Sequence, residues 1–262
     1  MSDLLAAYGR APSAHLLARS EPFPATDRRA RPAPSLNRKY EITCLVADLS
    51  LRHHTHVAPA IPAFEEATSA FARGTLIQTV SGPVAIEDLL PGDYIETTTG
   101  PAPVMWIGST TYVPSVENDE TGLTSLLRMT SDAMGRAQPE TDLLLGPGAR
   151  MVLHRDRLKT LIGQSRVLVP VADYVDEDRI VSLTPAGAVQ LYHLALKTHS
   201  TFRVNGLEME SYHPGASLRR QLGDALCEKL LGFFPHIESF SDFGELTLPR
   251  SSREVIDSLT AR

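Results

Sequence analysis

Residues 69–108 read SAFARGTLIQTVSGPVAIEDLLPGDYIETTTGPAPVMWIG, and this stretch decides the expected fold. Short apolar runs alternate in it with turn signals; the runs are Leu76–Val80, Val84–Ile86, Tyr94–Thr97 and Val104–Ile107. The turn signals between them are Ser81-Gly82-Pro83, Pro91-Gly92-Asp93 and Thr99-Gly100-Pro101. Glycine suits such turns because it takes the positive φ that a tight hairpin needs. Short strands separated this closely predict a mainly β fold.

Two blocks of the chain resemble the Hint family, the hedgehog/intein self-processing module, and are most similar to its bacterial stand-alone branch. The first block runs from Phe71 to Gly108, and the second, LYHLALKTHSTFRVNGLEMES, covers residues 191–211. The resemblance implies a Hint-type fold of many short strands with a small α-helical C-terminal extension. It also implies intramolecular autoprocessing, by a peptide N–S or N–O acyl shift, rather than turnover of a separate substrate.

The resemblance also locates the positions at which the chemistry of such a module would occur. In active members a cysteine or serine directly before the phenylalanine attacks the preceding carbonyl, and here that position holds Ala70. A Thr or Ser, two intervening residues and a His then polarise the scissile peptide and protonate its leaving amine. Those positions hold Gly146 and Ala149. The acyl shift needs a nucleophile and a proton donor, so the resemblance implies a degenerate, non-catalytic site.

Four other side chains are weighed as catalytic candidates. His199 occupies the position of a polar residue that assists later proton transfers in the family, and it is a possible proton-transfer residue here. Ser69, Thr75 and His154 are alternatives for an altered geometry, although Ser69 is one residue early and would face the opposite side of an extended segment. Splicing also needs a terminal asparagine, and the chain has Glu210-Ser211 in that region.

Composition limits the classes of partner. The chain has 262 residues, a formal charge of −6 and no basic patch, which argues against nucleic acid as a partner. Its two cysteines, Cys44 and Cys227, are far apart and predict neither a disulfide framework nor a cysteine zinc site. No cofactor is expected. Without a long apolar run or a signal-like start, a cytoplasmic location is the default, with signal-independent secretion left open.

The densest histidine group is LRHHTH at residues 51–56. On a strand, His54 and His56 would share one face, as a pair of metal ligands requires. No third ligand follows at a convincing spacing. We therefore predict a solvated loop at this segment and no metal site.

Four regions are expected along the chain. Residues 1–37, rich in Pro, Ala and Arg, predict a flexible tail, and residues 38–66 predict a connecting strand and loop. Residues 67–215 form the Hint-like β domain. Residues 216–262 form a helical C-terminal extension, with an amphipathic helix over 218–233 and a short helix over 252–259.

Three hypotheses for function follow. The leading one is a degenerate Hint protein that acts as a binding or scaffold module for an unknown protein partner. The second is an autoproteolytic Hint protein with altered catalytic residues. The third is an active precursor trapped by Cys-to-Ala and His-to-Ala replacement, for which Gly146 in place of Thr or Ser is unfavourable.

Overall fold

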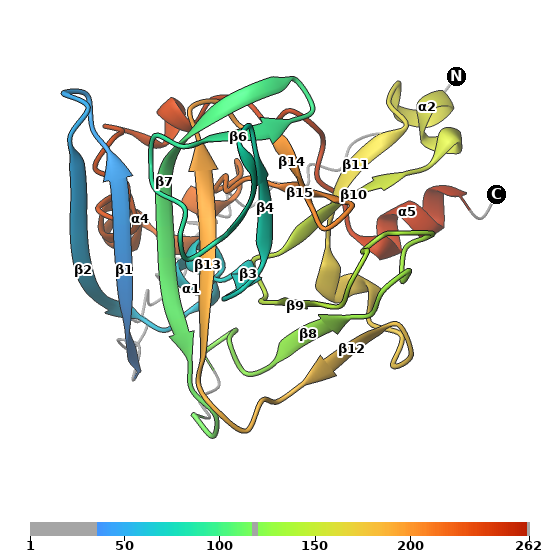
Figure 1. Ribbon diagram of the computed structural model, residues 1–262, viewed down its shortest axis with the longest axis horizontal. Coiled ribbons are helices and arrows are strands. Elements are labelled where there is room, and N and C mark those ends of the chain that lie inside the picture. Colours follow the sequence, from blue (N-terminus) through green and yellow to red (C-terminus); the bar gives the residue numbers. More distant parts are fainter. Residues whose placement is uncertain (1–35, 117–119, 261–262) are drawn as a thin grey trace, which may run out of the picture. The chain divides into compact units, whose positions relative to one another are not determined.

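The computed structural model describes residues 36–116 and 120–260, which belong to one compact unit, Pro34–Arg262. Strands dominate it, almost all in antiparallel pairs (Figure 1), and this confirms the mainly β class. The strands are β1 Asn37–Leu45, β2 Leu51–Pro59, β3 Phe71–Ala72, β4 Leu76–Thr79, β5 Gly82–Ala85, β6 Tyr94–Thr97, β7 Gly100–Tyr112, β8 Leu126–Met129, β9 Leu143–Leu145, β10 Arg150–His154, β11 Arg166–Pro170, β12 Ile180–Leu183, β13 Val189–Leu196, β14 Thr201–Val204 and β15 Leu207–Glu210.

The helices of the described residues are short and lie between or after the strands. The α-helices are α1 Pro62–Glu65, α2 Asp156–Ile162, α3 Leu218–Leu222, α4 Asp224–Leu231 and α5 Arg253–Thr260. The 3-10 helices are η1 Glu66–Thr68, η2 Val171–Tyr174 and η3 Phe240–Phe243. None of the helices within the described ranges has the length and apolar character needed to cross a membrane.

The hairpins predicted from turn residues are present. Strands β4 and β5 pair through Thr79 and Gly82, and β6 and β7 pair through Thr97 and Gly100. Strands β14 and β15 are joined by Asn205 and Gly206, with φ of 51° and 82°. Positive φ at both central residues is the geometry of the tight primed turn that an Asn-Gly pair favours.

Strands β7 and β13 form the long central pair that positions the site (Figure 1). On its far side β7 also pairs with β1, and β1 pairs with β2, so these two N-terminal strands are part of the same sheet. On its other side β13 pairs with the short strand β3, and β3 in turn pairs with β9. The segment around Ala70 and Phe71 is therefore held between two strands.

Three apolar clusters occur among the described residues, and the two largest bear on the site. The larger one lies among the short strands and includes Phe71 and Phe202. The second joins β1, α1 and the C-terminal helices around Tyr40, Trp106 and Phe233. The Trp106 Nε1–H group donates to the Phe233 carbonyl oxygen at 2.5 Å. The C-terminal extension thus packs against the same core as the β strands.

Local features outside the site differ from expectation. The segment predicted as a histidine loop is strand β2, because pairing with β1 over residues 51–59 satisfies its backbone groups. The helix predicted over 218–233 is two helices, since Gly223 adopts φ of +75° between α3 and α4. The strand expected near Tyr40 and the helix at 252–259 are confirmed as β1 and α5. Residues 1–35 of the predicted tail lie outside the described residues.

Candidate functional site

The Ser69–Ala70 peptide is buried, and both its carbonyl and its N–H group are hydrogen-bonded. Both residues have no exposed surface. The Ser69 carbonyl oxygen accepts from Gly148 N–H at 3.0 Å, and the Ala70 N–H donates to the Tyr192 carbonyl at 2.9 Å. The Ala70 carbonyl accepts from Gly146 N–H at 3.0 Å. These bonds continue the pairing of β3 with β13 and β9 through the residues before the strand.

Gly146 and Ala149, which are distant from Ala70 in the sequence, are brought close to it here. Gly146 lies so close to Ser69 that a Cβ built on it would be nearer than 3.0 Å to the Ser69 carbonyl oxygen. Ala149 is 1% exposed and belongs to the same apolar cluster as Ala70. The side chains of Ala70 and Ala149 are methyl groups and Gly146 has none, so these three residues themselves offer neither a nucleophile nor a proton donor.

The alternative nucleophiles and His154 are engaged elsewhere. The Ser69 hydroxyl donates to the Glu65 carbonyl at 2.6 Å, and the Thr75 hydroxyl donates to the Ala72 carbonyl at 2.7 Å. His154 ends β10, is exposed and lies 3.6 Å from the Asp156 carboxylate through its Nε2. None of these three side chains is aimed at the Ser69–Ala70 peptide by its hydrogen bonds.

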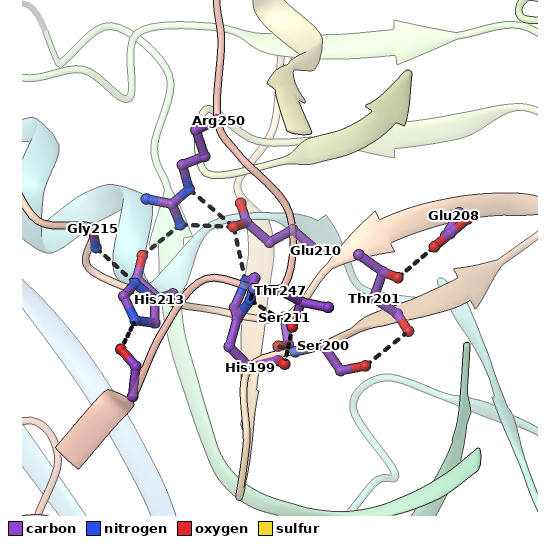
Figure 2. Close-up of polar contacts among 11 residues, drawn as sticks. His199, Ser200, Thr201, Glu208, Glu210, Ser211, His213, Gly215, Thr247 and Arg250 are labelled. Atoms are coloured by element: carbon purple, nitrogen blue, oxygen red, sulfur yellow. Dashed lines mark hydrogen bonds and ion pairs between the residues drawn. The ribbon is translucent and has the colours of Figure 1, made fainter. Parts of the chain in front are cut away.

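His199 belongs to a buried polar network that Figure 2 shows in close-up. Its Nδ1 accepts from Thr247 N–H at 3.0 Å, so the ring proton sits on Nε2, which donates to Glu210 Oε1 at 2.9 Å. The Thr247 hydroxyl also donates to the His199 carbonyl oxygen. Both ring nitrogens of His199 are thus occupied, one of them by a residue of the C-terminal extension.

Glu210 is the centre of this network. Its Oε1 accepts from His199 and from Arg250 Nε at 2.9 Å, and the Arg250 Nη2–H group donates to the His213 carbonyl at 2.7 Å (Figure 2). Burial raises the pKa of Glu210, but the hydrogen bond from His199 and the charge of Arg250 outweigh it, and the pKa lies below its usual value. Glu210 is therefore held as a carboxylate in the interior.

A cavity of about 340 Å³ lies between this network and the backbone of Gly148. Among its lining residues are Arg150, His193, Glu210 and Arg250. Arg150, His193 and Arg250 are not among the site residues predicted from the sequence. His193 and Glu210 each lie on a strand, β13 and β15, whose sequence predicts one buried face. Such a pattern does not reveal that the two residues line one cavity.

The model of the Hint domain matches residues 69–216, which is more than half of the chain. The chain belongs to the Hint family. The first of the two predicted blocks, at Phe71–Gly108, and the second, at residues 191–211, both lie inside the matched range of this Hint domain. No curated protein matches the chain.

Several solved inteins are similar to this Hint protein. The gp41-1 intein is 11% identical, with a TM-score of 0.35, and the match covers 55% of this chain and 98% of that one. A bacterial intein-like domain from Clostridium thermocellum is 16% identical, with a TM-score of 0.32 and coverage of 55% and 99%. The MchDnaB-1 intein is 12% identical, with a TM-score of 0.30 and coverage of 55% and 100%.

The histidine pair in the N-terminal part of the Hint protein has no metal-site geometry around it. The rings of His54 and His56 are 6.2 Å apart between centroids, and His56 packs against Phe233. Across residues 36–116 and 120–260, no group of three or more His, Cys, Asp or Glu side chains is arranged to hold a metal ion.

Proposed function

We propose that this Hint protein does not cleave its own backbone and acts as a binding or scaffold module. The observation that carries the proposal is the Ser69–Ala70 peptide. Its carbonyl and N–H groups are held by two backbone hydrogen bonds and it is fully buried, yet residue 70, the position of the family nucleophile, is an alanine. A donor on the Ser69 carbonyl stabilises charge only if a nucleophile creates it; without one, the same bond only holds the peptide in place.

The chain upstream of the peptide supports a scaffold role. Strand β1 pairs with β7 from Tyr40 to Cys44, and Phe64 of α1 lies in the second apolar cluster. A segment that is integrated this deeply would stay bound even if its covalent link were cut. Self-processing at Ser69–Ala70 would therefore release little, whereas an uncut chain keeps a continuous core.

The alternative of residual autoprocessing finds no support in the contacts of its candidate residues. Ser69 and Thr75 donate to nearby carbonyls, His154 is exposed on the end of β10, and His199 has both ring nitrogens occupied. We propose that none of the four replaces the missing cysteine. His199 is then a structural residue that fastens the C-terminal extension through Thr247.

The intact mass of the purified full chain tests this function. We expect a single species at full mass, both fresh and after prolonged incubation at neutral pH, with or without a thiol. Fragments whose masses place a break between Ser69 and Ala70, appearing faster with thiol, would contradict the proposal. In that case native chromatography should show the fragments eluting together, because β1 remains paired with β7.

Restoring the family residues at positions 70 and 149 distinguishes a naturally inactive Hint protein from an active precursor that is trapped by replacement. We expect Ala70→Cys combined with Ala149→His to remain uncut, because Gly146 contacts the Ser69 carbonyl directly and offers no polar side chain. Ala72→Cys, a buried position two residues along, is the matched control. Each variant needs its unfolding midpoint measured, since Ala149 is buried. Cleavage in the double variant alone would show that the alanines trap an active precursor.

A further inference from the structure

The cavity beside the Ser69–Ala70 peptide contains hydrogen-bond donors that the fold does not use. His193 is 4% exposed and lines it. Its Nδ1 accepts from the Leu194 N–H at 3.0 Å, so the ring proton is on Nε2. Burial lowers the pKa of His193 to about 3, which keeps the ring neutral. Within the described part of the chain, this Nε2–H group has no acceptor.

Arg150 brings a positive charge to the same cavity from the start of β10. Its side chain is 23% exposed, and its contact with Glu66 Oε2, from Nη2, is 3.4 Å long. A guanidinium has five N–H donors in a planar fork, and the remaining donors of Arg150 have no partner among the described residues. Arg250, by contrast, has Nε and Nη2 occupied by Glu210 and the His213 carbonyl.

Tyr212 adds a third donor. It is 8% exposed, lines the cavity, and burial raises the pKa of its hydroxyl, so the hydroxyl keeps its proton. No partner for this hydroxyl occurs among the residues that the structure describes. His193, Arg150 and Tyr212 thus present donors around one cavity that a ligand acceptor can take up.

The two carboxylates that line the cavity already pair with its arginines. Glu210 Oε1 accepts from His199 and Arg250, and Glu66, at 37% side-chain exposure, pairs with Arg150 at the rim. The unused donors of Arg150 and His193 therefore favour a ligand that brings its own acceptor. The planar fork of Arg150 matches a carboxylate, whose two oxygens it can bind side by side.

We propose that this cavity binds a carboxylate, which pairs with Arg150 and accepts from His193 Nε2. The inference rests on the proposed binding function and names the ligand class of the same site. A volume of about 340 Å³ suits a small molecule or the last one or two residues of a peptide. The carboxylate comes either from a free small acid or from the C-terminus of a chain, and the test distinguishes these two sources.

The test is a calorimetric titration of the full chain with three probes. They are acetate, N-acetyl-alanyl-alanine and the C-terminal amide of that peptide. We expect the free acid to bind and the amide to bind at least about tenfold more weakly, as the loss of one charged hydrogen-bonded pair implies. Acetate binding as tightly as the peptide acid would assign the site to free small acids. Equal binding of acid and amide, or no binding of any probe at millimolar concentration, would overturn the proposal.

Variants place the binding in this cavity. We expect Arg150→Gln to weaken acid binding at least about tenfold, with Arg150→Lys intermediate because charge remains and the fork is lost. Arg128→Gln, an exposed arginine paired with Asp142, is the matched control and should bind normally. Unfolding midpoints check that each variant folds, and intact masses after titration check cleavage separately, so a failure of the proposed function is seen independently. Unchanged binding by folded Arg150→Gln would contradict the assignment.

Discussion

Gly146 packs closely against the backbone of Ser69 and has no side chain. A Cβ there would lie closer than 3.0 Å to the Ser69 carbonyl oxygen, which is a backbone atom held by its own hydrogen bond. Overpacking of this kind costs about 1–3 kcal/mol. We expect Gly146→Ala to lower the free energy of unfolding by that amount in urea titrations. Gly187→Ala, with open space around its Cβ, is the control and should change it by less than about 0.5 kcal/mol; equal values for both would refute the prediction.

Buried histidines make stability depend on pH. Burial lowers the pKa of His193 to about 3 and those of His213 and His236 to about 4, although a hydrogen bond to Gly244 partly opposes this at His213. In the unfolded chain each histidine titrates near its ordinary pKa of 6.5. The unfolded chain therefore binds more protons below that pH, and stability falls as pH drops from about 6.5 to 4. The slope is up to about 1.4 kcal/mol per pH unit for each histidine.

Urea unfolding at a series of pH values measures this slope. We expect His213→Gln to reduce it by up to one proton between pH 6.5 and 4. Glu210 acts at lower pH, because its depressed pKa makes its contribution to stability present above its unfolded pKa and lost as pH falls through the folded-state pKa. A stability that is flat between pH 6.5 and 4 would contradict the assignment of these histidines.

At the scale of elements, Glu65 ties α1 to two distant segments. Its carboxyl group is fully buried and accepts from Arg38 Nε at 3.0 Å, Thr121 Oγ1 at 2.5 Å and Gly122 N–H at 2.7 Å. Removing one partner of a buried pair typically costs about 3–5 kcal/mol, because the other charge is left uncompensated. We expect Glu65→Ala to destabilise the protein by this amount, measured by denaturant unfolding.

An exposed ion pair on the neighbouring strand provides the control. Glu41 of β1 pairs with Lys39 at 2.7 Å, and both side chains reach solvent. Surface pairs contribute about 0–1 kcal/mol, so Glu41→Ala should have little effect. Similar losses for Glu65→Ala and Glu41→Ala would mean that the junction of β1, α1 and the loop at 121–123 does not hold the upstream segment in place.

For the whole molecule, the aromatic cluster predicts that the C-terminal extension unfolds together with the β core. Phe234 has no exposed surface and packs on Trp106 at 4.6 Å and on Tyr212 at 5.2 Å between ring centroids. We expect Phe234→Ala to cost about 3–5 kcal/mol, with coincident transitions by Trp106 fluorescence and far-ultraviolet circular dichroism. Val57→Ala, at a side chain 66% exposed, is the control. A separate early transition of Trp106 alone would show that the extension is an independent part.

Features that depend only on neighbouring residues in the chain could be predicted without the structure. Apolar runs and Gly turns located β4–β7, and Asn205-Gly206 located the β14–β15 hairpin, because turn conformation is a property of two or three adjacent residues. The family resemblance rests on two such local patterns, and the match of the Hint domain to residues 69–216 confirms it. The identity of residue 70 as alanine needs no structure at all.

The long-range contacts between residues could be seen only in the folded structure. The pairing of β2 with β1, which turns a polar histidine run into a strand, depends on a partner strand rather than on the run itself. Glu210 acquires His199, Arg250 and the cavity from segments that converge in space. Arg150 and His193 line that cavity together although their strands, β10 and β13, are not neighbours in the sheet. Sequence periodicity reports which face of an element is buried, and long-range packing alone determines what that face contacts.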